Sequence, residues 1–279
     1  MIELLNQYPL AFYVSVVFLG LCIGSFLNVV AYRIPIMMKR ELEADFKSLS
    51  ENPASFSQAE DKLPAFNLIT PNSRCCDCGA AIKPWHNIPV LGYLLLKGKC
   101  ANCGAGISLR YPIVEAVTGV FSLIVALKFG ATLETAGLLV LTWFLIALTL
   151  IDIDEYLLPD SITLPLIWIG LLFNVYGTFT DLESAVFGAV AGYLSLWSVF
   201  RLFKLITGKE GMGYGDFKLL AAIGAFLGWQ ALPVVILLSS AVGAEVGIAG
   251  IMILGRDKNI PIPFGPYLAA AGWLAAMRG

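Results

Sequence analysis

Apolar segments about as long as a membrane-spanning helix restrict the fold of this chain more than any other feature. An α-helix needs roughly 20 apolar residues to cross the hydrocarbon of a bilayer. The 279 residues are 58% hydrophobic and only 14% charged, which gives more apolar surface than a globular core of this size needs. We therefore predict an all-α polytopic membrane protein with about eight transmembrane helices, near residues 10–32, 111–129, 136–152, 161–178, 184–206, 217–230, 232–254 and 262–277.

Basic residues set the expected orientation, because cytoplasmic loops of membrane proteins hold the excess of lysine and arginine. With the N-terminus outside, only Lys128 and Arg278 of the 18 basic residues fall on the outer side. The first apolar segment is too long for the hydrophobic part of a signal peptide, so we expect it to remain as an anchor in the bilayer. The formal net charge of -2 offers no basic surplus for nucleic acid.

A polar block between the first two helices divides the chain into three expected parts. They are a first transmembrane helix in residues 1–33, a cytoplasmic domain in 34–110 and a seven-helix membrane domain in 111–279. Within the block, residues 40–65 mix Glu, Lys, Ser and Pro with few aromatic residues. That composition predicts a mobile excursion with one short helix.

The second half of the polar block carries two pairs of cysteines, Cys75-x-x-Cys78 and Cys100-x-x-Cys103, and a glycine follows each pair. Two such pairs present four thiolates to one tetrahedral ion, and we predict a zinc site. Two disulfides are the alternative, which the reducing cytoplasm disfavours. Four protein ligands leave no position for a reacting water, so the expected role of zinc is structural.

Three other residues with metal-binding side chains are not expected to join this site. Cys76 adjoins the first ligand and Cys22 lies inside the first helix, so neither has a suitable spacing. His86 lies between the pairs and could replace a thiolate, but a lone histidine in such a loop is more often a structural hydrogen bonder.

Two aspartates, Asp152 and Asp216, lie where apolar segments meet polar ones. A carboxylate at the edge of hydrocarbon is costly to keep charged, so such residues are candidates for function. In the predicted topology both lie at cytoplasmic helix ends and can meet. Two neighbouring carboxyls can share a proton and activate water, which is the chemistry of an aspartic protease. The alternative for Asp152 is a helix-end carboxylate solvated by water and lipid headgroups.

Other acids near Asp152 have simpler explanations. On a helix, Asp152 and Asp154 point to nearly opposite faces, so at most one of them can face a shared cavity. Asp154 and Glu155 begin a polar loop, and Asp152 is the deeper residue. Asp160 precedes a new apolar segment, which is the position of a helix N-cap.

Two further segments could shape a substrate site. Gly213 and Gly215 precede Asp216 and allow an extended substrate to pass close to the backbone, or they form a flexible turn. Residues 263–266, Pro-Phe-Gly-Pro, open the last helix on the same side of the membrane. They could line the groove, although a proline that starts a helix is the simpler interpretation.

Several ordered motifs together make the chain resemble a bacterial type IV prepilin leader peptidase, a membrane aspartic protease of the GxGD class, over nearly its whole length. Besides the four cysteines they include Gly24-Ser25-Phe26-Leu27-Asn28-Val29-Val30 with Arg33 and Pro35, Arg110-Tyr111-Pro112-Ile113-Val114-Glu115, Ile151-Asp152-Ile153-Asp154 with Leu158-Pro159-Asp160, Gly211-Met212-Gly213-Tyr214-Gly215-Asp216-Phe217-Lys218 and Pro263-Phe264-Gly265-Pro266-Tyr267.

The resemblance implies that Asp152 and Asp216 are the catalytic pair and that Cys75, Cys78, Cys100 and Cys103 bind zinc. The implied substrates are precursors of type IV pilins and type II secretion pseudopilins, whose short basic leader ends in glycine before an apolar helix. The implied second activity transfers a methyl group from S-adenosylmethionine to the new N-terminus, in the cytoplasmic loop and adjoining helix ends. The implied location is the bacterial inner membrane, with the active site facing the cytoplasm.

Other functions are compatible with a pair of acids in a membrane protein. A proton-coupled transporter or a pilus assembly scaffold is one, but a carrier usually places its acids near the middle of the membrane. A peptidase without methyl transfer is another, and the cysteine loop argues loosely against it. The residues do not indicate an oligomeric state.

Overall fold

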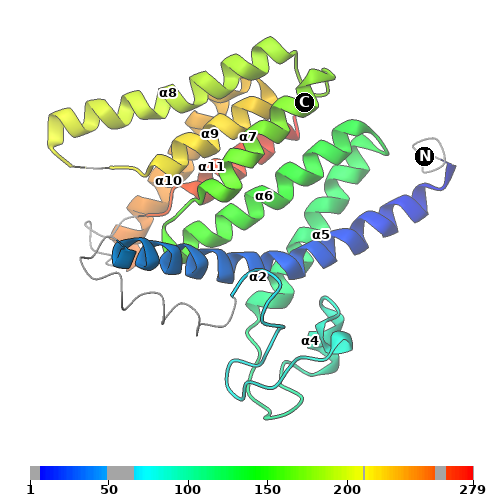
Figure 1. Ribbon diagram of the computed structural model, residues 1–279. Coiled ribbons are helices and arrows are strands. Elements are labelled where there is room, and N and C mark those ends of the chain that lie inside the picture. Colours follow the sequence, from blue (N-terminus) through cyan, green and yellow to red (C-terminus); the bar gives the residue numbers. More distant parts are fainter. Residues whose placement is uncertain (1–6, 49–65, 210, 255–261, 279) are drawn as a thin grey trace. The chain divides into compact units, whose positions relative to one another are not determined.

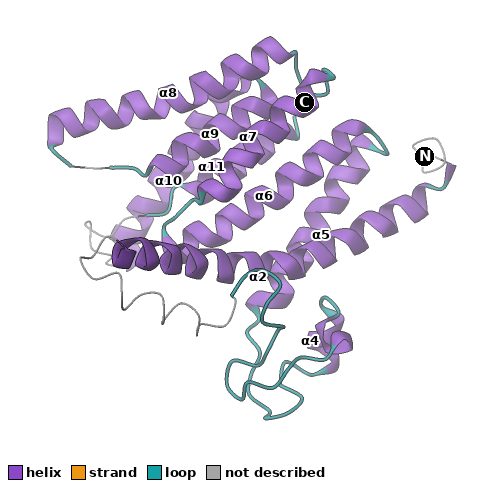
Figure 2. Ribbon diagram, in the orientation of Figure 1, coloured by secondary structure: helices purple, strands orange, loops and turns teal. Residues whose placement is uncertain are grey.

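The computed structural model describes residues 7–48, 66–209, 211–254 and 262–278, and these residues form helices joined by loops (Figures 1 and 2). Two isolated bridges between loop residues are the only strand-like pairings there. The predicted all-α class is therefore confirmed. The long helices are α2 (Pro9–Ser48), α5 (Arg110–Phe129), α6 (Leu133–Glu155), α7 (Asp160–Val175), α8 (Leu182–Thr207), α9 (Tyr214–Leu227), α10 (Leu232–Leu254) and α11 (Gly265–Ala276).

Each of the eight predicted apolar segments is helical, but fewer helices have the dimensions of a membrane span. Within the described residues, five apolar stretches are long enough to cross a bilayer: α2, α5, α6, α8 and Trp229–Ile253, which combines a short 3-10 turn with α10. α7 has 16 residues, α9 has 14 and α11 has 12. The described part of the chain thus combines membrane-capable helices with three shorter ones, of which α7 is apolar along its length.

The first helix is longer than predicted. α2 continues past residue 33 to Ser48, through Pro35. Its last turns are rich in Glu, Lys, Leu and Ala, which favour helix even where the sequence has become polar. The helical part of the predicted excursion is therefore an extension of α2, while residues 49–65 lie outside the described part of the chain.

The chain packs as two compact units. One comprises residues 17–120, with most of α2, the cysteine loop and the first half of α5. The other comprises residues 1–16 and 121–279, with α6 to α11. These units reflect packing and not membrane topology, so the predicted boundaries at residues 33/34 and 110/111 stay a prediction.

α9 is the central helix of the second unit. Every residue from Leu219 to Phe226 is buried, because α7 and α8 both pack against this helix. The contact with α8 is close: a Cβ on Gly188 would lie 2.3 Å from the carbonyl oxygen of Gly224. A helix surrounded by other helices does not need to reach lipid at both ends, which explains why α9 can be shorter than a span.

A buried side chain fixes the C-terminal end of α9. Asn174 of α7 donates from Nδ2 to the carbonyl oxygens of Ala225 and Phe226, at 2.8 and 2.9 Å. Its Oδ1 accepts from the backbone N–H groups of Phe179 and Thr180. The last carbonyls of a helix lack partners within the helix, so Asn174 satisfies them in a buried setting. Because α9 is a single helix, fixing its C-terminal end also fixes the position of its N-terminal end.

Candidate active site and metal centre

Asp152 lies three residues before the end of α6 and is buried, with 5% of its surface exposed. Tyr156 caps the end of the helix as a left-handed residue, and its N–H donates to the carbonyl oxygen of Asp152. Asp154 and Glu155 are exposed. The prediction that Asp152 and Asp154 face different surroundings is confirmed, and Asp152 is the acid that faces the protein interior.

Asp216 occupies the third position of α9, after the N-cap residue Gly213, and only 7% of its surface is exposed. The backbone of Gly213 hydrogen-bonds to its carboxyl group. This is half of a capping box, in which an acid at the third position satisfies the backbone at the N-cap. The helix dipole also favours negative charge at this end. The first turn of α9 therefore holds the carboxyl group in place.

Both acids belong to one site within the second unit. The side chain of Leu158 lies against Gly215, next to Asp216, and also against Gly265, whose N–H donates to Asp152 Oδ2 at 2.9 Å. Asp152 is close enough for its charge to act on Asp216. The structure thus brings the two predicted carboxyl groups together at the ends of α6 and α9.

Gly265 is a site residue to which the sequence analysis gave no role of its own. It is buried at the start of α11, and a Cβ there would lie 2.7 Å from Asp152 Oδ2, so the close hydrogen bond requires glycine. Pro266 follows in the first turn, which confirms that this motif starts a helix. The sequence feature that could have drawn attention to Gly265 is the Pro-Phe-Gly-Pro motif. The motif both starts α11 and supplies a donor to Asp152.

The prediction that Asp160 caps α7 is wrong. Pro159 occupies the N-cap with an extended backbone, and Asp160 follows as the first helical residue, where its charge favours the positive end of the helix dipole. Its carboxylate pairs with Lys218 of α9. Because Asp160 is 57% exposed, this pair contributes only about 0–1 kcal/mol to stability.

The two predicted substrate-binding glycines lie in different surroundings. Gly215 is closely packed, since a Cβ there would lie 2.5 Å from Leu158 Cβ. Gly213 is exposed, and the nearest atoms to a Cβ at its position are 3.8 and 4.0 Å away. Gly215 therefore has a packing reason to be glycine, and Gly213 has open space beside Asp216. Their part in substrate binding stays a prediction.

Gly215→Ala is expected to destabilise the protein by about 1–3 kcal/mol and to reduce its activity, because the new methyl group must displace Leu158 between the two acids. Gly213→Ala is the matched control: its methyl group meets open space, so it should cost less than about 1 kcal/mol, the loss of a better N-cap residue. Thermal unfolding in detergent and cleavage assays on both variants measure the difference. Equal loss of stability in the two variants would contradict the packing role of Gly215.

The four predicted cysteines form a compact cluster within the first unit. The sulfur atoms of Cys75, Cys78, Cys100 and Cys103 all lie within 4.8 Å of one another, and those of Cys75 and Cys103 are 3.8 Å apart. Tetrahedral coordination with Zn–S bonds of about 2.3 Å places sulfurs about 3.8 Å apart. All six cysteines of the chain are free thiols, so the two-disulfide alternative is not found. His86 and Cys76 do not belong to this cluster of described residues.

The two cysteine pairs have the same backbone structure. Cys75 N–H donates to Ala80 and Cys100 N–H to Ala105, while the glycine after each pair donates back to the first cysteine. Both glycines have a positive φ, 68° for Gly79 and 75° for Gly104, which turns the chain around the cluster. The shared geometry points four sulfurs at one centre and fits a single tetrahedral cation.

Without a cation, the cluster favours a thiolate at Cys100 and a thiol at Cys103. Backbone hydrogen bonds from Cys103 and Asn102 lower the pKa of Cys100 to about 6. Cys103 accepts a hydrogen bond from Ala105, which lowers its pKa, but the neighbouring sulfurs of Cys78, Cys100 and Cys75 raise it to about 12. Four thiolates repel one another at this distance, and a divalent cation at the centre would relieve that repulsion.

Three buried polar residues of the quoted motifs support the first unit. Asn28 of α2 donates to the Tyr111 carbonyl oxygen at the start of α5. Arg33 donates from its two guanidinium nitrogens to the carbonyl oxygens of Asn67 and Pro71, at 2.7 and 2.6 Å. These contacts join α2 to α5 and to the loop that leads into the cysteine cluster.

Glu115 is the third of these residues, and it holds a strained part of the same loop. Its Oε2 accepts from the N–H of Val90 at 2.6 Å, and Val90 has a φ of 60°, which is rare for a β-branched residue. Sequence reasoning assigned Asn28, Arg33 and Glu115 no role, because their partners are backbone atoms and the sequence does not mark such partners.

Comparison with known proteins gives a consistent result along the whole chain. Residues 18–129 match the bacterial peptidase A24 N-terminal domain, and residues 139–248 match the type IV leader peptidase family. A prepilin leader peptidase/N-methyltransferase of Pseudomonas aeruginosa is 52% identical over 279 residues, which is 100% of this chain and 94% of that protein.

Other bacteria contain similar proteins of the same name. The one from Aeromonas hydrophila is 52% identical and covers 100% of this chain and 95% of its own length. The one from Neisseria gonorrhoeae is 50% identical over 256 residues, 92% of this chain and 87% of its own. No solved structure matches the chain.

Proposed function

Because the chain belongs to the type IV leader peptidase family, we propose that it removes the leader peptide of prepilins with Asp152 and Asp216 and then methylates the new N-terminus. The observation that carries the catalytic assignment is the pair of buried carboxyl groups at one site, joined by Leu158 and by the N–H of Gly265. Precursors of type II secretion pseudopilins are further proposed substrates.

The proposed peptidase step uses one carboxylate and one carboxylic acid. The carboxylate takes a proton from water, whose oxygen attacks the scissile carbonyl carbon, and the other carboxyl group donates its proton to the carbonyl oxygen. The tetrahedral intermediate then collapses: the C–N bond breaks, and the amine leaves with the proton that the first carboxyl group took from water. The second carboxylate takes back a proton from a hydroxyl group of the intermediate. The first turns of α9 and α11 point N–H groups at the pair, which supports one negative charge there.

The proposed second step transfers a methyl group from S-adenosylmethionine to the new N-terminal amine. The amine nitrogen forms a bond to the methyl carbon, the carbon–sulfur bond of the sulfonium breaks, and a proton leaves the nitrogen. We place this step in the cytoplasmic loop and the adjoining helix ends. The name of the relatives supports the activity, and the site within the loop is our proposal.

The four clustered cysteines are proposed to bind one zinc ion that stabilises the loop and takes no part in hydrolysis. The spacing of the sulfurs supports this choice, and four protein ligands close the coordination sphere. The proposed topology has eight membrane helices in the inner membrane and an active site on the cytoplasmic face. Both acids lie at helix ends, as that arrangement requires.

The test is the mass of a purified prepilin after incubation with the purified protein in detergent. With S-adenosylmethionine present, we expect loss of the leader and gain of one methyl group at the new N-terminus. Without it, we expect a cleaved but unmethylated product, because hydrolysis needs no methyl donor. An uncleaved precursor in both reactions would contradict the peptidase, and a cleaved, unmethylated product in both would contradict the methyltransferase.

A further inference from the structure

The loop that carries the cysteine cluster also has an exposed apolar surface. In the short helix α4 (Leu91–Leu95), Leu91, Leu94 and Leu95 are 56%, 61% and 74% exposed. Their spacing of three and four residues places them on one face of this helix. Trp85 and Ile88 of the preceding turn are exposed as well. These five residues are called the α4 patch.

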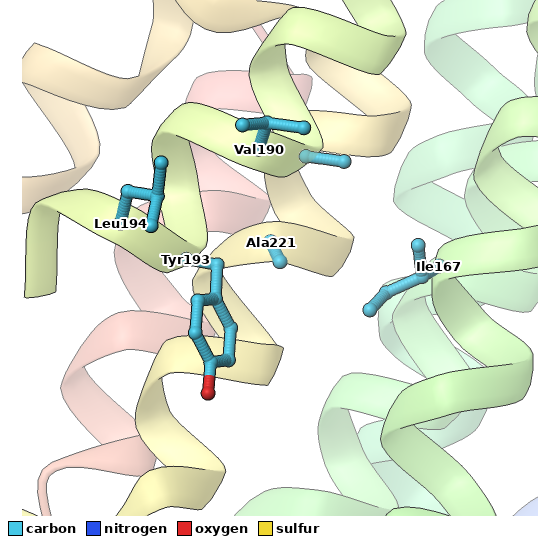
Figure 3. Close-up of a pocket in the computed structure, with 6 residues that line it drawn as sticks. Ile167, Val190, Tyr193, Leu194 and Ala221 are labelled. Atoms are coloured by element: carbon cyan, nitrogen blue, oxygen red, sulfur yellow. The ribbon is translucent and has the colours of Figure 1, made fainter. Parts of the chain in front are cut away.

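The α4 patch differs from the apolar surface of the second unit. Figure 3 shows a hollow there of about 340 Å³, lined in part by Ile167 of α7 and by Val190 and Leu194 of α8. α8 is long and apolar enough to span a bilayer, so acyl chains can cover such residues. α4 has only five residues and lies in a loop, so its surroundings must be inferred from the contacts of that loop.

Two helices of the first unit reach a common level that corresponds to the edge of the bilayer. Asn28 lies 19 residues after Pro9, the start of α2, which is about 28 Å along the helix. Asn28 donates to the carbonyl oxygen of Tyr111, and α5 runs 18 residues from there to Phe129, about 27 Å. Each length matches the roughly 30 Å of hydrocarbon that a span must cross. The level of Asn28 and Tyr111 is therefore taken as the bilayer edge.

A hydrogen bond places the start of α4 inside this edge, beside the N-terminal part of α5 (Figure 1). Glu115 lies four residues after Tyr111, about 6 Å further along α5. Its Oε2 accepts from the N–H of Val90 at 2.6 Å, and Val90 directly precedes α4. A helical side chain points back toward the N-terminus, so Val90 lies slightly nearer the edge than the Glu115 backbone. The resulting depth is that of an interfacial helix, about 5–10 Å below the headgroups.

The part of the loop around Phe66 lies on the outer side of the same edge. The guanidinium carbons of Arg33 and Arg40 are 5.6 and 4.3 Å from the centroid of the Phe66 ring. These arginines lie five and twelve residues past Asn28, about 7.5 and 18 Å further along α2. Ile69, three residues after Phe66, is 83% exposed. The loop thus has exposed apolar residues on both sides of the edge, and only the α4 patch lies at lipid depth.

The charges around α4 suit an anionic lipid surface. Residues 78–114 contain no Asp or Glu, and their four lysine and arginine residues are Lys83, Lys97, Lys99 and Arg110. The three lysines are exposed, and Lys83 Nζ lies 5.5 Å from the centroid of the Trp85 ring. Lysines beside an inserted apolar face can extend to phosphate headgroups, and tryptophan is enriched at the same depth.

We propose that the α4 patch inserts into the interface of the bilayer, with lipid headgroups and the adjoining acyl chains as its partner. The proposal goes beyond the peptidase and methyltransferase activities and does not depend on either. The patch continues the exposed apolar surface of α5, which includes Ile113 and Val117. A second protein is the alternative occupant, but a surface at this depth that the chain itself leaves uncovered meets lipid first.

Fluorescence quenching in lipid nanodiscs tests the depth of α4. A fluorescent amino acid is encoded at position 95 of the full-length protein and, in a matched control, at the exposed position 69. The nanodiscs contain phosphatidylcholine and phosphatidylglycerol with brominated acyl chains. We expect the bromine to lower the emission from position 95 about twofold or more and to leave position 69 unchanged, while iodide in the water quenches position 69.

Two results would overturn the proposal. Quenching of position 95 by iodide and not by bromine would place α4 in water. Protection of position 95 from both quenchers would show that protein and not lipid covers the patch.

A double substitution gives a second measurement, with the fluorescent amino acid moved to position 91. Leu94→Asp combined with Leu95→Asp should reduce quenching by bromine about twofold or more, because carboxylates are costly among acyl chains and are repelled by anionic headgroups. Ile69→Asp is the matched control and should leave this quenching unchanged. Because all three side chains are exposed, both variants should unfold in detergent at the wild-type temperature. A folded double variant with unchanged quenching would refute insertion.

Discussion

We expect Asp152→Asn and Asp216→Asn each to abolish removal of the leader peptide, while the protein still inserts and folds. Asparagine has the shape of aspartate and keeps its carbonyl oxygen as an acceptor, so the hydrogen bond from Gly265 to position 152 can remain. The amide cannot take up or release the proton that hydrolysis requires. A proton-transfer role contributes about 10²–10⁴-fold to the rate, and both roles are needed in one turnover.

The exposed acid Asp154 provides the control. It lies on the same helix as Asp152, two residues away, but outside the buried site. Asp154→Asn should cleave at close to the wild-type rate in membranes with equal amounts of protein, measured by the gel shift of a prepilin. Full cleavage by Asp152→Asn together with loss in Asp154→Asn would mean that the wrong acid had been chosen.

The double variant distinguishes a catalytic pair from two independent structural residues. If the carboxyl groups act as a unit, Asp152→Asn combined with Asp216→Asn loses no more activity than either single variant. If each residue only stabilises its own helix end, the losses in unfolding free energy should add. Thermal unfolding of all three variants, measured beside cleavage, separates these cases.

The site residues that could be predicted from the sequence have polar or reactive side chains, which are rare in such surroundings unless they have a function. A carboxyl group at a hydrocarbon edge and four cysteines at fixed spacing are rare, so Asp152, Asp216 and the cysteines could be selected by chemistry alone. Gly265 acts through a backbone N–H, and every residue except proline has one. Only the three-dimensional approach of α11 to α6 reveals its role.

Packing determined the features that the sequence did not predict. The expected N-cap at Asp160 failed because Pro159 already supplies the extended residue that precedes α7. The apolar pattern located all eight helices but could not distinguish a helix facing lipid from one facing other helices. α9 is as apolar as a span yet is surrounded by protein, with Asn174 at its C-terminal end.

Loss of zinc should unfold the cysteine loop, and this is the second large effect that we expect. The wild-type protein should hold about one zinc per chain, and the double variant Cys75→Ser with Cys100→Ser should hold none, as measured by elemental analysis. A structural zinc site contributes about 10–16 kcal/mol of binding free energy, which stabilises the folded loop. Limited proteolysis should then cut the variant between residues 66 and 109, where the wild-type protein resists.

Cys76→Ser is the matched control for this experiment, because Cys76 adjoins Cys75 but is exposed and outside the cluster. It should keep its zinc and its resistance to protease. A wild-type protein without zinc, or a double variant that keeps it, would contradict the site. The carboxyl pair belongs to the other compact unit. Cleavage by the zinc-free variant would therefore mean that the ion only stabilises the loop. Loss of cleavage with intact membrane helices would mean that the loop takes part in the peptidase step.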